Sequence, residues 1–438
     1  MKDFRLKRII SIFFLIPLKL HPLFFYGLQT DENKTSIWQY GLLLRKFLVC
    51  HVLNGTRSLR LIRHTYLNIK RFIIINSVWF IMDTDTKVQL IKEFAEEIVT
   101  EEELRHIFET NDHPIAYDGF EPSGISPIHF GLLRATNLKN MIKAGVKFKL
   151  YLADYFAFVN NKLGGNLDNI RTAGKYFVEV WKACGIDTSK VDIMWAKDIM
   201  NGLDYWDKTL KIAREISLER NLRAVTIMGR KQSEKLNVGQ LLYPSMQVTD
   251  IFYMDVDICQ LGMDQRRANM LAREIATKLK WKKPVAAHHH IILGLQGLQK
   301  KATEEETLMA SKMSKSDPKS CIYMHESYED IKKKINSAYC PEKQEEGNPL
   351  LEYCKHIIFK ELKSMKIQRS AKFGGDVEYE SYQELGDDYI KGKLHPADLK
   401  NGVADALEKL IKPAREYFEK NKQAKELYEK VKRFTITR

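Results

Sequence analysis

Residues 113–154 read HPIAYDGFEPSGISPIHFGLLRATNLKNMIKAGVKFKLYLAD, and this stretch decides the fold. It opens with the alternation of a strand, which runs into a loop rich in Gly, Pro and Ser. A helix follows and ends at Gly145, and the next strand places Phe148, Leu150 and Leu152 on one side. A strand, a helix and a second strand in this order favour a parallel pair joined by a right-handed crossover.

The same alternation continues along the chain. Further strands are expected at 191–196 and 283–292, and further helices at 167–185, 204–220 and 264–281. This pattern predicts an α/β fold built on a parallel sheet. From about residue 326 the pattern is nearly all helical. We therefore expect three parts, with bounds 1–81, 82–325 and 326–438.

Two helix ends are predicted in detail. Thr86 and Gln89 form a candidate capping box directly after Met82, and the apolar positions up to Ile98 share one helical face. Near the other end of the chain, Pro396 marks a helix start and Pro413 is expected to bend or break that helix.

The first 81 residues have a different composition from the rest. Residues 1–82 contain 13 Lys or Arg and 3 Asp or Glu, so they carry most of the formal net charge of +14. The remainder is nearly balanced, so bulk charge gives little argument for or against a nucleic-acid partner. The apolar stretch 9–18 is too short to span a bilayer. Two interpretations stay open, a signal or organellar transit segment, or an upstream extension without function.

Cysteine and histidine predict no metal site. The six cysteines include no Cys-x-x-Cys pair of the kind found in zinc or redox sites. Six cysteines in 438 residues are too few for a disulfide scaffold, which indicates a reducing compartment. His288, His289 and His290 form a run, but no acidic or thiol ligand has zincin spacing. We interpret them as ordinary residues at the edge of a buried strand.

Two local strings indicate nucleotide chemistry. The first is Lys312-Met313-Ser314-Lys315-Ser316, in which two ammonium groups can follow the charge of a phosphate chain. Its alternative is a solvated surface loop. The second is YDGFEPSGISPIHFG (117–131), between the first strand and its helix, where doubly wound sheets bind nucleotides. Together and in this order, the two strings resemble the paired signatures of class I aminoacyl-tRNA synthetases.

A third string is more specific. Residues 241–274, LLYPSMQVTDIFYMDVDICQLGMDQRRANMLARE, are similar almost position by position to tyrosyl-tRNA synthetases of the archaeal and eukaryotic cytosolic type. The resemblance extends from about Val88 to the end of the chain. It includes the strings YDGFEPSG, IMGR, AYCP, EGNPLLEY, KFGGD and LHPADLKN.

The resemblance implies a fold and a reaction. The fold is a Rossmann-type catalytic domain followed by a smaller, all-helical domain that binds the anticodon. Tyrosine and ATP, accompanied by Mg²⁺, give tyrosyl-adenylate, and the tyrosyl group then passes to the 3′ end of tRNA(Tyr). Members of this family are homodimers, and we expect a cytoplasmic location with no membrane association.

The resemblance also assigns the tyrosine site. Tyr117 and Asp250 match the pair that hydrogen-bonds the substrate phenol. A donor and an acceptor fixed there penalise phenylalanine, which would leave both unpaired. The group around the substrate ammonium is matched by Tyr243, Gln247 and Gln265, with Glu121 in the same motif. Without the full motif, Tyr243 and Gln247 would be two residues of a packed helix face.

For ATP, Lys312 and Lys315 match the lysines that stabilise the pyrophosphate leaving group. The first histidine of the family's His-Ile-Gly-His signature falls at Pro127 in an ungapped alignment, whereas a shift of two residues restores it at His129. The second signature histidine is absent. The expected ATP-binding residues are Gly119, His129, Lys312, Met313, Ser314, Lys315 and Ser316, and His129, Lys312 and Lys315 are the catalytic candidates.

For tRNA, Phe373 and Asp398 match residues that stack on and hydrogen-bond the first anticodon base. The alternative is a core phenylalanine and a charge near a helix N-terminus. Two rival functions stay open, a tryptophanyl-tRNA synthetase and a non-catalytic RNA-binding paralogue. The phenol-reading pair argues against the first, and the intact lysine motif against the second.

Overall fold

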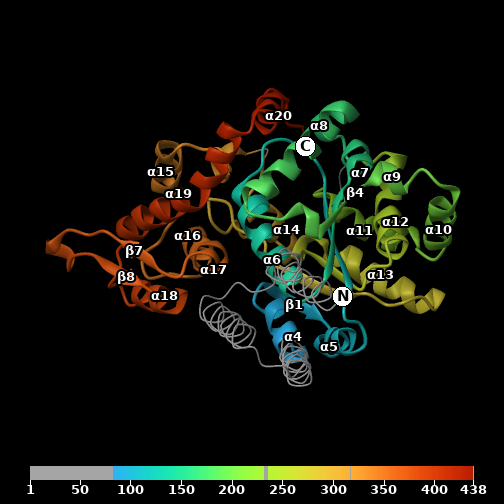
Figure 1. Ribbon diagram of the computed structural model, residues 1–438, viewed down its shortest axis with the longest axis horizontal. Coiled ribbons are helices and arrows are strands. Elements are labelled where there is room, and N and C mark those ends of the chain that lie inside the picture. The colour runs from blue at the N-terminus through green and yellow to red at the C-terminus, as the bar shows by residue number, and fades with distance from the viewer. Residues whose placement is uncertain (1–81, 231–234, 316, 438) are drawn as a thin grey trace, which may run out of the picture. The chain divides into compact units, whose positions relative to one another are not determined.

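The computed structural model describes residues 82–230, 235–315 and 317–437, and a mixed sheet lies at its centre (Figure 1). In this part of the chain the sheet has six strands in the order β1-β6-β5-β2-β3-β4. Strands β2 to β6 run parallel, and β1 pairs antiparallel with β6 at one edge. The bounds are β1 (Ala95–Val99), β2 (Ile115–Phe120), β3 (Lys147–Leu152), β4 (Val191–Trp195), β5 (Ile258–Gly262) and β6 (Val285–His289). The α/β fold with a parallel sheet is confirmed.

The order of the strands reverses at β2. Strands β3 and β4 follow β2 on one side, whereas β5 and β6 lie on the other, with Tyr117 of β2 opposite Cys259 of β5. In open α/β sheets, the crevice outside the carboxyl ends of the strands at such a reversal is where ligands bind. The topology therefore predicts a site beyond Phe120 and Gly262.

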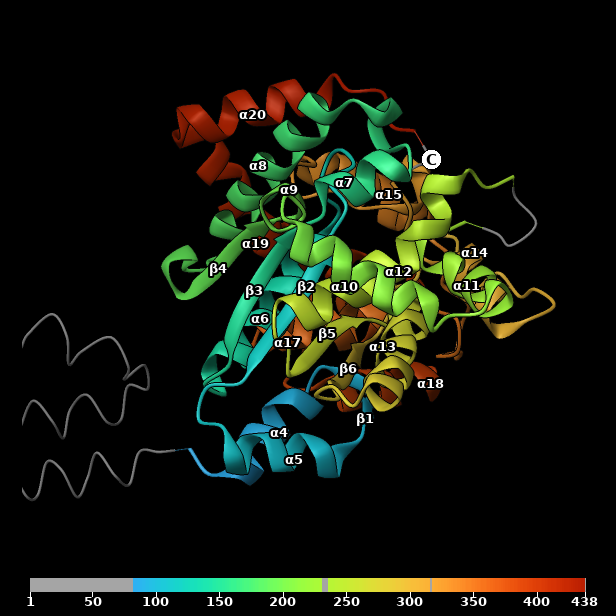
Figure 2. The same ribbon diagram turned by 90° about the vertical axis from the view of Figure 1, so that its right-hand side faces the viewer.

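Alternate residues of the strands enter two separate hydrophobic cores. Ala116, Phe148 and Leu150 belong to the core shared with α6 (Arg134–Lys143) and α8 (Leu167–Ala183). Tyr117 and Tyr151 belong to the core shared with α10, α12 and α13. The sheet is thus covered on both faces (Figure 2), and the period of two places Tyr117 on the face away from α6. The bounds are α10 (Leu203–Arg214), α12 (Val238–Tyr253) and α13 (Arg266–Leu279).

The predicted helix after Met82 is wrong beyond its second turn. Helix α4 (Thr84–Lys92) is capped by Asp83, which accepts from the Thr86 N–H, and not by Thr86. Residues Ala95–Val99 form β1 instead of continuing the helix. Pairing with the open edge of β6 satisfies the backbone there, and this tertiary gain outweighs local helical periodicity. Helix α5 (Glu101–Thr110) begins with a capping box formed by Thr100 and Glu103.

The region after residue 326 is helical, as predicted, with one addition. Strands β7 (Met365–Ile367) and β8 (Val377–Tyr379) form a short antiparallel ribbon that the sequence pattern did not reveal. The helices are α15 (Tyr328–Ser337), α16 (Pro349–Tyr353), α17 (Phe359–Glu361), α18 (Tyr382–Ile390), α19 (Pro396–Lys420) and α20 (Lys422–Lys432).

Pro413 does not break its helix. Helix α19 runs through it to Lys420, because Ile411, Ala414 and Phe418 are buried on both sides of the proline and their packing holds the two halves in line. The same hydrophobic core contains residues of α8, α19 and α20. Among the described helices, none is long and apolar enough to cross a membrane.

Candidate active site

A cavity of about 340 Å³ opens at the carboxyl ends of β2 and β5, where the strand order reverses. The predicted tyrosine and ATP residues that the structure describes all line it: Tyr117, Gly119, Glu121, His129, Tyr243, Gln247, Asp250, Gln265, Lys312, Met313, Ser314 and Lys315. Ser316 lies outside the described residues. Residues separated by almost 200 positions in sequence thus meet in one cavity.

The closed end of the cavity contains Tyr117 and Asp250. Both are buried, with 2% and 1% of their surfaces exposed. The Tyr117 hydroxyl makes no hydrogen bond with the described residues, whereas one Asp250 oxygen accepts from the Tyr205 hydroxyl at 2.7 Å. Burial raises the pKa of the Asp250 carboxyl well above its usual range. A buried hydroxyl without a partner costs free energy unless a ligand satisfies it.

Helix α12 supplies Tyr243, Gln247 and Asp250 to the cavity. It begins with a capping box in which Asn237 accepts from the Gln240 N–H and Gln240 accepts from the Asn237 N–H. Spacings of three and four place the cavity-facing residues on one side of a helix. Tyr243 also packs against the Phe156 ring, so the same helix face both fills the core and lines the cavity.

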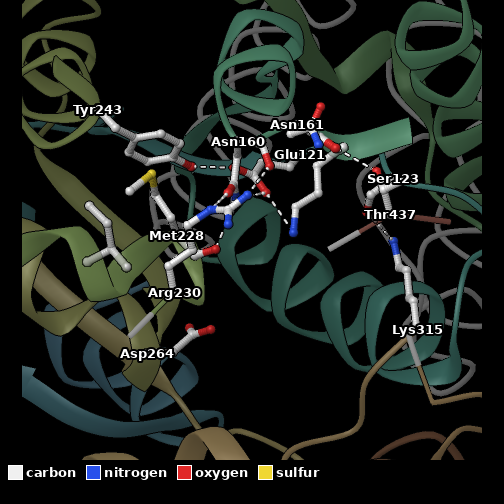
Figure 3. Close-up of polar contacts among 12 residues, drawn as sticks. Glu121, Ser123, Asn160, Asn161, Met228, Arg230, Tyr243, Asp264, Lys315 and Thr437 are labelled. Atoms are coloured by element: carbon white, nitrogen blue, oxygen red, sulfur yellow. Dashed lines mark hydrogen bonds and ion pairs between the residues drawn. The ribbon is translucent and has the colours of Figure 1, made fainter. Parts of the chain in front are cut away.

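Glu121 is the centre of a polar network on the cavity wall (Figure 3). It accepts from the Tyr243 hydroxyl at 2.8 Å and from Asn160 Nδ2 at 3.0 Å, and Lys162 Nζ lies 3.7 Å from it. Asn160 Oδ1 in turn accepts from Arg230 Nε at 2.8 Å. Carboxylate and amide oxygens so arranged suit an ammonium group.

The adjoining wall holds two glutamines in fixed orientations. Gln247 Nε2 donates to Gln265 Oε1 at 3.2 Å, and Gln265 Nε2 donates to the Ile227 carbonyl at 3.0 Å. The bond between the two glutamines uses Nε2 of Gln247, so its side-chain oxygen, Oε1, can accept a hydrogen bond. Gln247 lines the cavity.

The opposite end of the cavity is cationic. Lys312 Nζ donates to Asp264 Oδ2 at 3.1 Å, and Lys315 Nζ donates to Ser123 Oγ at 3.2 Å. The Lys315 ammonium also lies 4.6 Å from the centre of the Phe177 ring. Burial, followed by the charge of Lys162, lowers the pKa of Lys315 to about 7. An incoming anion would restore its proton.

His129, and not Pro127, faces this end. Pro127 forms a backbone bridge with Tyr323, outside the lining of the cavity. His129 opens a π-helical turn, η1 (His129–Leu133), and its Nδ1 lies 3.2 Å from Met313 Sδ. Turns of this kind are frequent at functional sites. Burial, together with the nearby Arg134 and lysine charges, lowers the pKa of His129 to about 3, so the ring is neutral at physiological pH.

Several cavity residues were missed from sequence. Arg134 forms an ion pair with the buried Asp118, whose pKa burial raises to about 6. Asn160 and Lys162 come from a loop without any motif, and Ile436 and Thr437 come from beyond α20. Arg230 could have been found from the sequence, because it ends the string IMGR that carries part of the family resemblance.

The predicted anticodon residues lie away from the cavity. Asp398 is in the first turn of α19 and is partly exposed. Phe373 ends a 3₁₀ turn between β7 and β8, and its side chain is outside the described side chains. Arg369 of the same ribbon donates to the Lys393 carbonyl at 3.2 Å, which brings the two loops together.

The histidine run lies on β6 and the residue after it, as predicted for a buried strand. His288 Nδ1 is 2.8 Å from Glu97 Oε2, and His289 Nδ1 is 2.8 Å from Gln260 Nε2. Within the described residues, no group of three or more His, Cys, Asp or Glu side chains is placed to hold a metal ion.

Comparison with known proteins agrees with this geometry. The model of the family "tRNA synthetases class I (W and Y)" matches residues 109–412. The chain is 42% identical to tyrosine–tRNA ligase 1, cytoplasmic, of Arabidopsis thaliana over 81% of this chain and 90% of that protein. It is 43% identical to the tyrosine–tRNA ligase of Thermococcus kodakarensis over 80% and 99%, respectively.

A solved structure gives the same result. The tyrosyl-tRNA synthetase of Pyrococcus horikoshii complexed with L-tyrosine superposes with a TM-score of 0.74 at 40% identity, over 80% of this chain and 100% of that one. The chain therefore belongs to the class I tRNA synthetases, as a member of the tyrosyl-tRNA synthetases of archaeal and eukaryotic type.

Proposed function

We propose that this chain is a tyrosine–tRNA ligase that forms tyrosyl-adenylate and transfers the tyrosyl group to tRNA(Tyr). The observation that carries the proposal is the closed end of the cavity, where the unpartnered Tyr117 hydroxyl and the buried Asp250 carboxyl lie. A phenol satisfies both groups. Phenylalanine satisfies neither, and the indole of tryptophan has a donor but no acceptor for the Tyr117 hydroxyl. Tyrosyl-tRNA synthetases are the usual illustration of discrimination against phenylalanine.

In the first step, a carboxylate oxygen of tyrosine attacks the α-phosphorus of ATP. The bond to the bridging oxygen breaks, and pyrophosphate leaves with its electron pair. The nucleophile is already ionised, so no general base is required. Positioning and charge stabilisation by Lys312, Lys315 and His129 supply the catalysis.

In the second step, a hydroxyl of the terminal ribose of tRNA attacks the activated carbonyl, and AMP leaves. Mg²⁺ would accompany ATP. Asp264 is the acidic side chain beside the lysines and is paired with Lys312, so the ion would depend mainly on the phosphates. This arrangement is usual for Mg²⁺, which binds one or two carboxylates plus substrate phosphates.

The test is tyrosine-dependent exchange of pyrophosphate into ATP by the full chain, with tryptophan and phenylalanine run in parallel. We expect exchange with tyrosine alone. Exchange with tryptophan would indicate the rival synthetase. A folded protein that exchanges with no amino acid would indicate the non-catalytic paralogue.

Replacing Asp250 by alanine tests the phenol site. The change leaves the substrate hydroxyl without its acceptor, so kcat/KM for tyrosine should fall by roughly 5- to 150-fold, or about 1–3 kcal/mol. Asp192→Ala, an exposed carboxylate of β4, is the matched control. An unchanged kcat/KM in Asp250→Ala would remove Asp250 from the tyrosine site.

We further propose that residues 326–438 read the anticodon while residues 82–325 carry out the chemistry, with Phe373 stacking on a base and Asp398 accepting its N–H groups. Asp398→Ala should raise KM for tRNA by about tenfold and leave pyrophosphate exchange unchanged. Glu419→Ala, at the far end of α19, is the control. Loss of exchange in Asp398→Ala would indicate a structural role.

We further propose a homodimer, supported by four exposed apolar side chains on three neighbouring helices. Leu203 and Leu210 of α10, Leu218 of α11 (Leu218–Ala224) and Val238 of α12 are 84%, 68%, 65% and 77% exposed, on helices that pack together. Apolar patches of this kind mark interaction sites. Sedimentation velocity would distinguish a dimer from a monomer.

For location, we propose the cytoplasm, the compartment named for the Arabidopsis relative. Import through residues 1–81 is the alternative. Those residues lie outside the described part of the chain. Microscopy of the full chain and of residues 82–438, each fused to a fluorescent protein, separates the two locations.

A further inference from the structure

The segment after α20 reaches the cationic end of the cavity. Ile436 and Thr437 line the cavity although they lie more than 100 residues beyond the lysine motif. The Thr437 hydroxyl donates to the Asn161 carbonyl at 2.5 Å and accepts from the Gly164 N–H at 2.9 Å. Figure 3 shows Thr437 beside Asn161 and Ser123, on the same side of the site as Lys315.

These two hydrogen bonds flank Lys162. The loop that contains it has an unusual backbone, because Asn161, Leu163 and Gly164 have φ values of 59°, 51° and 67°. Positive φ is costly for leucine and persists only where the surrounding structure holds it. Thr437 helps to stabilise this backbone, because its hydroxyl bonds both the Asn161 carbonyl before Lys162 and the Gly164 N–H after it.

Lys162 lines the same cavity as Lys312 and Lys315. Its side chain is 20% exposed, lines the cavity and lies 3.7 Å from Glu121. Its charge contributes to the lowered pKa of Lys315, which shows that the two ammonium groups share one electrostatic environment. The nearby Glu121 carboxylate offsets part of the repulsion between these two ammonium groups, and a phosphate chain would offset more of it.

A second contact ties the same segment to the loop before η1. Ile436 packs on Gly124, where φ is 116° and a Cβ atom would meet Ile436 at 3.3 Å. The preceding residue, Ser123, accepts the hydrogen bond from Lys315. The segment therefore contacts both loops that carry or support the cations of the site.

Helix α20 fixes this segment in place. Tyr428 stacks on His325 with ring centres 3.8 Å apart, and His325 Nε2 lies 2.8 Å from the Tyr176 hydroxyl of α8. The same hydroxyl accepts from the Ser126 N–H at 3.2 Å. The approach of Thr437 to the cavity is thus set by buried packing between α20 and α8.

We propose that Thr437 is a positioning residue for tyrosine activation, which holds the 160–165 loop so that Lys162 contributes with Lys312 and Lys315 to binding the phosphates of ATP. The proposal rests on the proposed function, since it assigns a further part of the same site. It makes Lys162 a binding residue for ATP, and Thr437 acts through it.

The test compares three variants in tyrosine-dependent pyrophosphate exchange. Thr437→Val keeps the shape of the side chain and removes both hydrogen bonds, so KM for ATP should rise about tenfold while KM for tyrosine stays within about twofold. Thr437→Ser keeps the hydroxyl and should restore the wild-type value. Thr435→Val makes the same change on an exposed side chain two positions away and should have no effect.

A double-mutant cycle tests whether Thr437 acts on ATP binding through Lys162. In a Lys162→Met background, Thr437→Val should add little to the rise in KM for ATP, because the residue it positions is already gone. Fully additive effects would overturn the link to Lys162. Equal rises in both KM values, or a defect confined to transfer onto tRNA, would overturn the assignment to ATP. An inactive wild-type protein would instead contradict the proposed function.

Discussion

Replacing Lys315 by methionine is expected to slow adenylate formation by about 10²–10³, the usual cost of removing one group that meets charge developing in a transition state. The Lys315 ammonium lines the same cavity as Tyr117 and Asp250, and the proposed function assigns it to the pyrophosphate leaving group. Methionine keeps the length of the side chain, so the change removes the ammonium charge together with its contact with the Phe177 ring.

Single-turnover formation of tyrosyl-adenylate measures this effect. Lys319→Met, an exposed lysine just beyond the same motif, is the control and should keep the wild-type rate. A wild-type rate in Lys315→Met would show that Lys312 alone stabilises the leaving group.

The lowered pKa of Lys315 adds a pH dependence. A lysine with a pKa of about 7 loses its proton as pH rises through that value, so kcat/KM for ATP, which reports the free enzyme, should decline above about pH 7. Lys315→Arg stays protonated and should lose this decline. His129 cannot cause this decline, because a histidine with a pKa of about 3 is already neutral at pH 7.

Replacing His129 by alanine is expected to slow the same step by about 10²–10³, with tyrosine affinity unchanged. His129 begins η1, where the Phe130 and Gly131 N–H groups donate to the Pro127 carbonyl. The His129 side chain, which lines the cavity, is therefore the group expected to meet the developing charge. Stopped-flow or quenched-flow single turnovers measure the rate, and His106→Ala, on the exposed side of α5, is the control. A wild-type rate would mean that the lysines suffice without His129.

The sequence predicted those site residues that belong to long motifs. Tyr117, Asp250 and the lysine pair lie in one cavity as expected, because each follows a strand or lies on a helix whose position the α/β pattern determines. The choice between Pro127 and His129 required the structure. It depends on the pairing of Pro127 with Tyr323, a contact between segments almost 200 residues apart.

Other features had no local signal. Ala95–Val99 has the periodicity of a helix, and only the open edge of β6 makes it a strand. Strand β5 was hidden between two helical patterns, because a strand buried on both faces shows no alternation. Thr437 and Asn160 act through backbone groups of distant loops, and such contacts leave no pattern in sequence.

The core shared by α8, α19 and α20 has a consequence for folding. Helix α8 lies in the region proposed for chemistry, whereas α19 and α20 lie in the region proposed for anticodon reading, yet their buried side chains form one continuous cluster. Separating the chain at residue 325 would expose the apolar surface of α8 to water. The two functions are therefore expected to be lost together on heating, in a single cooperative transition, although their ligands bind at separate places.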